Sequence, residues 1–134
     1  MTVRQISAGP GLPAGFPFSL ASEGNGLLFI SGMPALDADG AFLPGSFEEE
    51  ADRAWASVMA IAAAGGCGRG EFLYVQVLLG DIGSYAGLNA WWRRQFPDPA
   101  TAPARLTYQA GALPFGAKIE FQVVAQQPGA GRCY

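Results

Sequence analysis

Two stretches near the end of this chain alternate polar and apolar residues, and they constrain its fold more than any other feature. Arg105, Thr107 and Gln109 alternate with Leu106, Tyr108 and Ala110, and Lys118, Glu120 and Gln122 alternate with Ile119, Phe121 and Val123. A period of two is the pattern of a strand in a sheet with one covered face. We therefore predict that residues 101–125 form a hairpin-like pair of strands joined by a short loop, with polar side chains on one face.

Hydrophobic periodicity and turn residues predict four earlier strands and two helices. The strands are expected near residues 2–7, 18–23, 27–31 and 71–79, and the helices over residues 46–64 and 84–96. Residues 27–31 are almost continuously apolar, which is typical of a strand buried on both faces. The element order β, β, β, α, β, α, β, β predicts an α+β fold in which one face of a sheet carries both helices and the other is bare.

Both predicted helices carry informative residues. Ser46 and Glu49 have the spacing of a capping box, which marks the start of the first helix. The second helix has an apolar stripe that should face the core, made of Tyr85, Leu88, Trp92 and Phe96. Asn89 lies on the same stripe. A buried amide needs hydrogen-bond partners, so Asn89 either finds them within the chain or reaches a site.

Composition limits the classes of function. The 134 residues suffice for one domain, which we expect over 1–134 with a loose tail over 126–134. Only 14% of residues are charged, which fits either an oligomer that buries surface or a surface rich in Gly, Ala and Pro. The net charge of −3 offers no basic footprint for nucleic acid, and the apolar runs are too short to span a membrane.

The chain contains no histidine, so imidazole bases, Ser-His-Asp triads and histidine zinc sites are excluded. Cys67 and Cys133 form no CxxC motif and predict no disulfide framework. The thiol of Cys67 stands near Arg69 and is either activated by that charge or inert. No apolar segment follows the first residues, so we expect a cytoplasmic protein.

Two charged residues interrupt the alternating strands and are the main candidates for a site. The guanidinium of Arg105 can bind a carboxylate through two parallel hydrogen bonds, or pair with a surface carboxylate of this chain. Glu120 either faces solvent from an edge strand or lies beside a cleft, where it can activate water. The backbone at Ser31 and Gly32 forms either a ligand contact or an ordinary turn.

Several segments in order resemble one family. Residues 15–19 are similar to a G-P-Y-S segment, 28–32 to an apolar strand ending in S-G, 72–81 to a strand ending in an acidic turn, 85–89 to F-A-x-x-N, and 103–105, 113–114 and 118–120 to P-A-R…L-P…x-I-E. These are motifs of the Rid (reactive intermediate deaminase) family, also known as the YjgF/L-PSP endoribonuclease family. The resemblance covers about residues 15–125.

The resemblance implies a chorismate-mutase-like subunit of about six strands and two helices, assembled as a homotrimer with clefts between subunits. It implies hydrolysis of enamines and imines such as 2-aminoacrylate to 2-keto acids and ammonia, without metal or cofactor. Arg105 would bind the substrate carboxylate, and Glu120 would position or activate the attacking water. The remaining residues that would line the pocket are Phe18, Ser31, Gly32, Asn89 and Thr107.

Three positions depart from the family pattern. Phe18 replaces a pocket tyrosine, Met33 a frequent glutamine and Thr107 a frequent cysteine. A more apolar pocket would favour a bulkier or aromatic-derived imine. Two alternatives are a non-catalytic ligand-binding trimer of the same fold, and a ribonuclease or translation inhibitor. The retained Arg105 and Glu120 disfavour the first, and the acidic charge without histidine disfavours the second.

Overall fold

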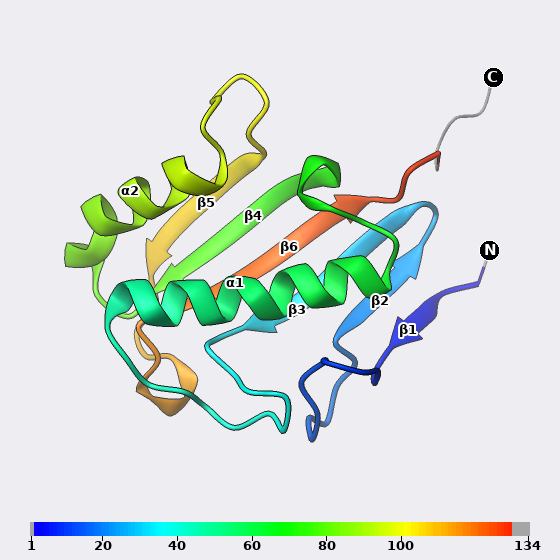
Figure 1. The fold of residues 1–134 in the computed structure, drawn as a ribbon, viewed down its shortest axis with the longest axis horizontal. Coiled ribbons are helices and arrows are strands. Elements are labelled where there is room, and N and C mark those ends of the chain that lie inside the picture. Colours follow the sequence, from blue (N-terminus) through cyan, green and yellow to red (C-terminus); the bar gives the residue numbers. More distant parts are fainter. Residues whose placement is uncertain (1, 130–134) are drawn as a thin grey trace.

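A six-stranded sheet carries both long helices on one face, as the element order predicts (Figure 1). The computed structural model describes residues 2–129, which leaves Cys133 and the end of the expected tail outside. The strands are β1 (Arg4–Ile6), β2 (Ala21–Gly24), β3 (Leu27–Met33), β4 (Phe72–Leu79), β5 (Ala104–Gln109) and β6 (Ile119–Gln126), and the helices are α1 (Phe47–Ala64) and α2 (Tyr85–Gln95). Within residues 2–129, neither helix is long and apolar enough to cross a membrane.

The last strand of the chain lies near the middle of the sheet. The strand order is β1-β2-β3-β6-β4-β5, in which β4 and β5 pair in parallel and β6 pairs antiparallel with both β3 and β4. The prediction of a hairpin-like pair was therefore wrong, because β4 separates β5 from β6. A period of two identifies a strand but does not identify its neighbours.

The connection from β5 to β6 passes over the end of β4. The amide of Ala110 donates to the carbonyl of Leu79, and the amide of Gly80 donates to the carbonyl of Lys118, each over 2.9 Å. A Cβ at Gly80 would lie 2.8 Å from the carbonyl oxygen of Ala117, so this close crossing requires glycine. The crossing delivers the chain into the gap between β3 and β4.

The core lies between the sheet and the helices, around the indole of Trp55. Its ring makes edge-on contacts with four other aromatic rings, from Phe72, Trp91, Phe96 and Phe121, at 5.1–5.9 Å between centroids. The inward face of α2 differs from the predicted stripe, because Leu88 and Trp91 are buried while Tyr85 is exposed. The helix is thus rotated so that Tyr85, Asn89 and Trp92 flank the core.

The sheet face opposite the helices is open. Phe29 is 47% exposed on this face, so the prediction of a strand buried on both sides was wrong for β3. Leu106 and Tyr108 of β5 are also exposed on it. Along β6 the residues at 119, 121, 123 and 125 are buried, and Glu120 and Gln122 alternate with them toward the open face. An open face with large apolar side chains is typical of an interface.

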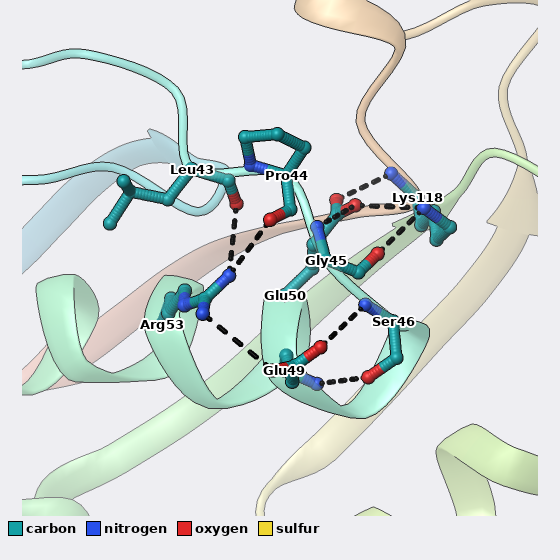
Figure 2. A network of polar contacts seen from close by, with 8 residues as sticks. All are labelled: Leu43, Pro44, Gly45, Ser46, Glu49, Glu50, Arg53 and Lys118. Carbon is teal, nitrogen blue, oxygen red and sulfur yellow. Dashed lines mark hydrogen bonds and ion pairs between the residues drawn. The ribbon is translucent and has the colours of Figure 1, made fainter.

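A buried carboxylate ties the start of α1 to the start of β6, as Figure 2 shows. The side chain of Glu50 is 1% exposed and accepts hydrogen bonds from the amide of Lys118 (2.9 Å) and from its ammonium group (3.1 Å). The same ammonium donates to the carbonyl of Gly45 over 2.7 Å. The predicted capping box of Ser46 and Glu49 is confirmed next to it. Lys118 therefore precedes β6, and its side chain binds Glu50 at the start of α1. The alternation had predicted that it shares a face of the sheet with Glu120.

Candidate active site

Arg105 lies near the start of the edge strand β5, and α2 holds its side chain. Its Nη2 donates a hydrogen bond to Oδ1 of Asn89 over 2.7 Å and lies 3.5 Å from the hydroxyl of Tyr85. The guanidinium carbon lies 5.0 Å from the ring centroid of Trp92 and 5.7 Å from that of Tyr85, both within cation–π range. No ion pair within residues 2–129 involves Arg105, so neutral groups fix this charge.

A cleft of about 320 Å³ opens beside Arg105, between the end of α2 and residues 97–102, with Asn89 and Trp92 on its wall. Thr107 lies two residues further along β5 on the same face as Arg105. Its hydroxyl is buried and has no hydrogen-bond partner among residues 2–129. We call Tyr85, Asn89, Trp92, Arg105 and Thr107 the Arg105 cluster.

Glu120 lies on the central strand β6, which rules out the interpretation as an edge-strand residue. Its side chain is half-buried, and no group within residues 2–129 donates a hydrogen bond or forms an ion pair with its carboxylate. Burial raises the pKa of this carboxyl above its ordinary value of 4.5. A carboxyl group in such a setting is suited to exchanging protons with a ligand or with water.

A bulge in β3 that includes Ser31 and Gly32 brings Gly32 to Glu120. Between the pairs Ile30–Val123 and Met33–Phe121, β3 contains one residue more than β6. A Cβ at Gly32 would lie 2.6 Å from Oε2 of Glu120, so only glycine leaves room for the carboxylate in this place.

Ser31 ties this bulge to the segment that carries Phe18. Its amide donates to the carbonyl of Leu20 over 2.8 Å, and its hydroxyl donates to the carbonyl of Ser19 over 2.7 Å. Phe18 itself is 50% exposed and stacks on Phe16 with 5.3 Å between ring centroids. We call Phe18, Ser31, Gly32 and Glu120 the Glu120 cluster.

The fold places the two clusters apart. Arg105 points to the side of the sheet that carries α2, whereas Glu120 points to the open face. Their strands are separated by β4, which is about 10 Å at the usual strand spacing. The sequence-predicted residues thus form two separate groups in one chain. The apolar stripe predicted that Tyr85 and Trp92 face the core, and so it missed their contact with Arg105. Their spacing around Asn89 was the available signal, because it places all three residues on one helical face.

Cys67 does not belong to either cluster. Its thiol is buried, and burial together with the nearby carboxylates of Glu71 and Glu23 raises its pKa. The inert interpretation is therefore favoured over activation by Arg69. Within residues 2–129, no group of three or more His, Cys, Asp or Glu side chains is placed to hold a metal ion.

Known proteins share both the sequence and the fold of this chain. The profile of the family described as endoribonuclease L-PSP matches residues 11–127. A goat (Capra hircus) 2-iminobutanoate/2-iminopropanoate deaminase is 34% identical over 127 residues, which cover 93% of this chain and 91% of the goat protein. The mitochondrial protein mmf2 of Schizosaccharomyces pombe is 32% identical over 119 residues, covering 87% and 92%. The crystal structure of yeast Mmf1 superposes with a TM-score of 0.85 at 25% identity, over 94% of this chain and 99% of that chain.

Proposed function

Since this chain belongs to the endoribonuclease L-PSP family and resembles a goat imine deaminase over most of both chains, we propose that it is an enamine/imine deaminase. Its substrates are 2-imino acids and their enamine tautomers, and its products are 2-keto acids and ammonia. An imine is already electrophilic, so the reaction needs a bound substrate, a positioned water and one proton-transfer group. A chain without histidine can supply all three.

In this reaction Arg105 binds the substrate carboxylate through the part of its guanidinium that Asn89 leaves free. Glu120 accepts a proton from the water as the water oxygen bonds to the carbon of the protonated imine, and the electron pair of the C=N bond moves to the nitrogen. The carbinolamine that results carries both the new hydroxyl and the amino group. Glu120 then returns this proton to the nitrogen, the C–N bond breaks as ammonia leaves, and the hydroxyl gives its proton to the Glu120 carboxylate as the carbonyl of the keto acid forms.

The observation that carries the proposal is the half-buried carboxylate of Glu120, whose pKa burial raises and which lies against Gly32 without a partner in residues 2–129. A structural carboxylate in a sheet is normally paired, as Glu50 is with Lys118. A raised pKa brings a carboxyl closer to the pH at which it can both accept and donate a proton.

The site is shared between subunits in a homotrimer. The Arg105 cluster of one chain has to meet the Glu120 cluster of another, because β4 and the two faces of the sheet keep them apart within a chain. Contact between two different patches is heterologous, and repetition of such a contact closes into a ring. The exposed Phe29, Leu106 and Tyr108 on the open face provide the apolar surface that such a contact buries.

The preferred imine is bulkier or more apolar than the 2-aminoacrylate tautomer. Phe18 stacks on Phe16 and carries a half-exposed ring without a hydroxyl, next to Ser19, whose carbonyl accepts a hydrogen bond from Ser31. Imines generated from alanine, leucine and phenylalanine by an amino acid oxidase rank this preference, with kcat/KM expected to rise with side-chain size. A larger kcat/KM for the alanine-derived imine, or no change between Phe18→Tyr and wild type, would contradict it.

The activity test supplies 2-aminoacrylate from a dehydratase and measures release of the keto acid. Wild type should accelerate release, while Arg105→Ala and Glu120→Gln should each be much slower at substrate concentrations below the KM of wild type. Coexpressed in equal amounts, the two variants should recover roughly a quarter of the sites by random assembly, because each intact site takes Arg105 from one chain and Glu120 from another. No acceleration by wild type with several 2-imino acids would contradict the function, and no recovery on mixing would contradict the shared site.

We place the reaction in the cytoplasm, where reducing conditions suit the free thiol of Cys67. A relative in fission yeast is named a mitochondrial protein, so compartments differ among similar chains. Cell fractionation with an antibody against the natural protein tests the placement, and recovery in another compartment would contradict it.

A further inference from the structure

Resting on the carboxylate-binding role of Arg105 in the proposed function, we propose that Trp92, assisted by Tyr85, is a positioning residue for substrate binding. Its ring keeps the planar guanidinium of Arg105 in one orientation. This fixed orientation raises the affinity for the substrate carboxylate. Neither aromatic residue has to touch the reacting carbon in this role.

The helix α2 presents three residues to Arg105 from one face. Tyr85, Asn89 and Trp92 are four and three residues apart, which places them one above the other along a helix. Arg105 reaches this face from the edge strand β5 and contacts all three. These three residues therefore face the cation of Arg105. The residues that α2 buries in the core are Leu88 and Trp91.

Each neighbour occupies a different part of the guanidinium. The ring centroids of Trp92 and Tyr85 lie 5.0 and 5.7 Å from its carbon, and Oδ1 of Asn89 accepts a hydrogen bond from Nη2. No residue within 2–129 accepts a hydrogen bond from Nε or Nη1 of Arg105. The hydroxyl of Tyr85 lies 3.5 Å from the same Nη2, and a carboxylate that displaces this long contact meets one complete forked pair of N–H groups, whichever hydrogen of Nη2 Asn89 accepts. Without these contacts the arginine side chain would become ordered only when the ligand binds. The conformational entropy lost at that moment would weaken binding.

Trp92 and its neighbour Trp91 separate this role from simple packing. Trp91 is buried, stacks on Phe121 and donates its indole hydrogen to Asp52 over 2.8 Å, so it belongs to the core. Trp92 is only half-buried, and besides Arg105 its ring contacts that of Phe96 at 4.7 Å. Trp91→Phe is therefore a matched control that removes core contacts on the same helix without touching Arg105.

The experiment measures KM, kcat and the Kd for 2-oxobutanoate, a stable keto acid with the same carboxylate. Trp92→Leu should raise both KM and Kd by roughly 3- to 30-fold, the range of a cation–π contact, with kcat changed less than threefold. Trp92→Phe should restore part of the affinity, because an aromatic ring returns beside the guanidinium. Trp91→Phe should lower the melting temperature and leave KM and Kd unchanged.

A folded Trp92→Leu protein with KM and Kd within twofold of wild type would overturn the proposal, as would an equal rise in Trp91→Phe. Circular dichroism and melting curves identify variants that fail to fold. If Trp92→Leu fails to fold, the Kd of Trp92→Phe is the test, and a Kd equal to that of wild type would overturn the proposal. If wild type binds 2-oxobutanoate in a Trp92-dependent way but does not hydrolyse imines, the positioning role stands and the deaminase function fails. If wild type does neither, both fail.

Discussion

The Arg105 cluster and the Glu120 cluster are built in opposite ways. In the first, neutral side chains of α2 surround a full charge with a hydrogen bond and two aromatic rings. In the second, a carboxylate is half-buried beside Gly32 and receives no hydrogen bond from residues 2–129. A group that binds gains from being fixed before its ligand arrives, whereas a group that exchanges protons needs a shifted pKa. The contrast suggests that binding and chemistry are divided between the two clusters.

Replacing each charged group by a neutral one is the most direct test of the division between binding and chemistry. Glu120→Gln should lower kcat by about 10²- to 10⁴-fold with a small change in KM, because it removes only the proton-transfer group. Arg105→Ala should act mainly on KM, because it removes binding to a carboxylate that does not react. Steady-state kinetics over a wide substrate range separate the two. Equal effects of both variants on kcat would show that the division is wrong.

Crowding the carboxylate tests the Glu120 cluster alone. In Gly32→Ala the new Cβ would meet Oε2 of Glu120 at 2.6 Å, so the carboxylate has to move. A displacement of this kind should lower kcat by about 10²-fold, while the fold survives because a flexible side chain gives way. Gly70→Ala is the control, since no atom lies within 4 Å of its Cβ. Wild-type kcat in a folded Gly32→Ala protein would contradict the placement.

The dependence of activity on pH sharpens the role of burial. Glu120 has to be ionised to accept a proton, so kcat/KM should fall as the pH is lowered through its pKa, which lies above 4.5. In a shared cleft the guanidinium of the neighbouring Arg105 favours the ionised form. Arg105→Ala should therefore move this acidic limb to higher pH. The pH profiles of both proteins test the sign, and a limb that moves to lower pH would contradict it.

The smallest expected effect concerns the paired carboxylate that contrasts with Glu120. Lys118→Met removes the ammonium group from the buried Glu50, which should lower the free energy of unfolding by about 1–3 kcal/mol. Arg94→Met removes an exposed ion pair with Glu48 and should change it by about 1 kcal/mol or less. Urea denaturation at one protein concentration compares them. Equal losses would mean that burial of Glu50 does not matter for stability.

The sequence was sufficient for the elements and for the identity of the candidate residues. Period-two alternation located β5 and β6, and the spacing of Ser46 and Glu49 located the start of α1. These features depend on neighbours along the chain, which a sequence displays directly. The candidate residues came from single charges in alternating strands and from the order of motifs, and their roles stay predictions.

Relations between distant segments could not be predicted in this way. Insertion of β6 between β3 and β4 depends on long-range pairing that leaves no periodic signal. The choice of Trp91 over Trp92 for the core depends on how α2 is rotated against the sheet, and adjacent tryptophans look alike in sequence. The contact of Gly32 with Glu120 follows from a bulge, and a glycine after Ser31 is equally typical of a turn.

The position of β6 has a consequence for biosynthesis. A ribosome makes this strand after β3 and β4, yet both of them need it as a neighbour. Until residues 119–126 emerge, each of those strands exposes an apolar edge that can pair with another unfinished chain. The strand that protects against such aggregation also carries Glu120. A chain that stops before residue 119 therefore lacks both the completed sheet and Glu120.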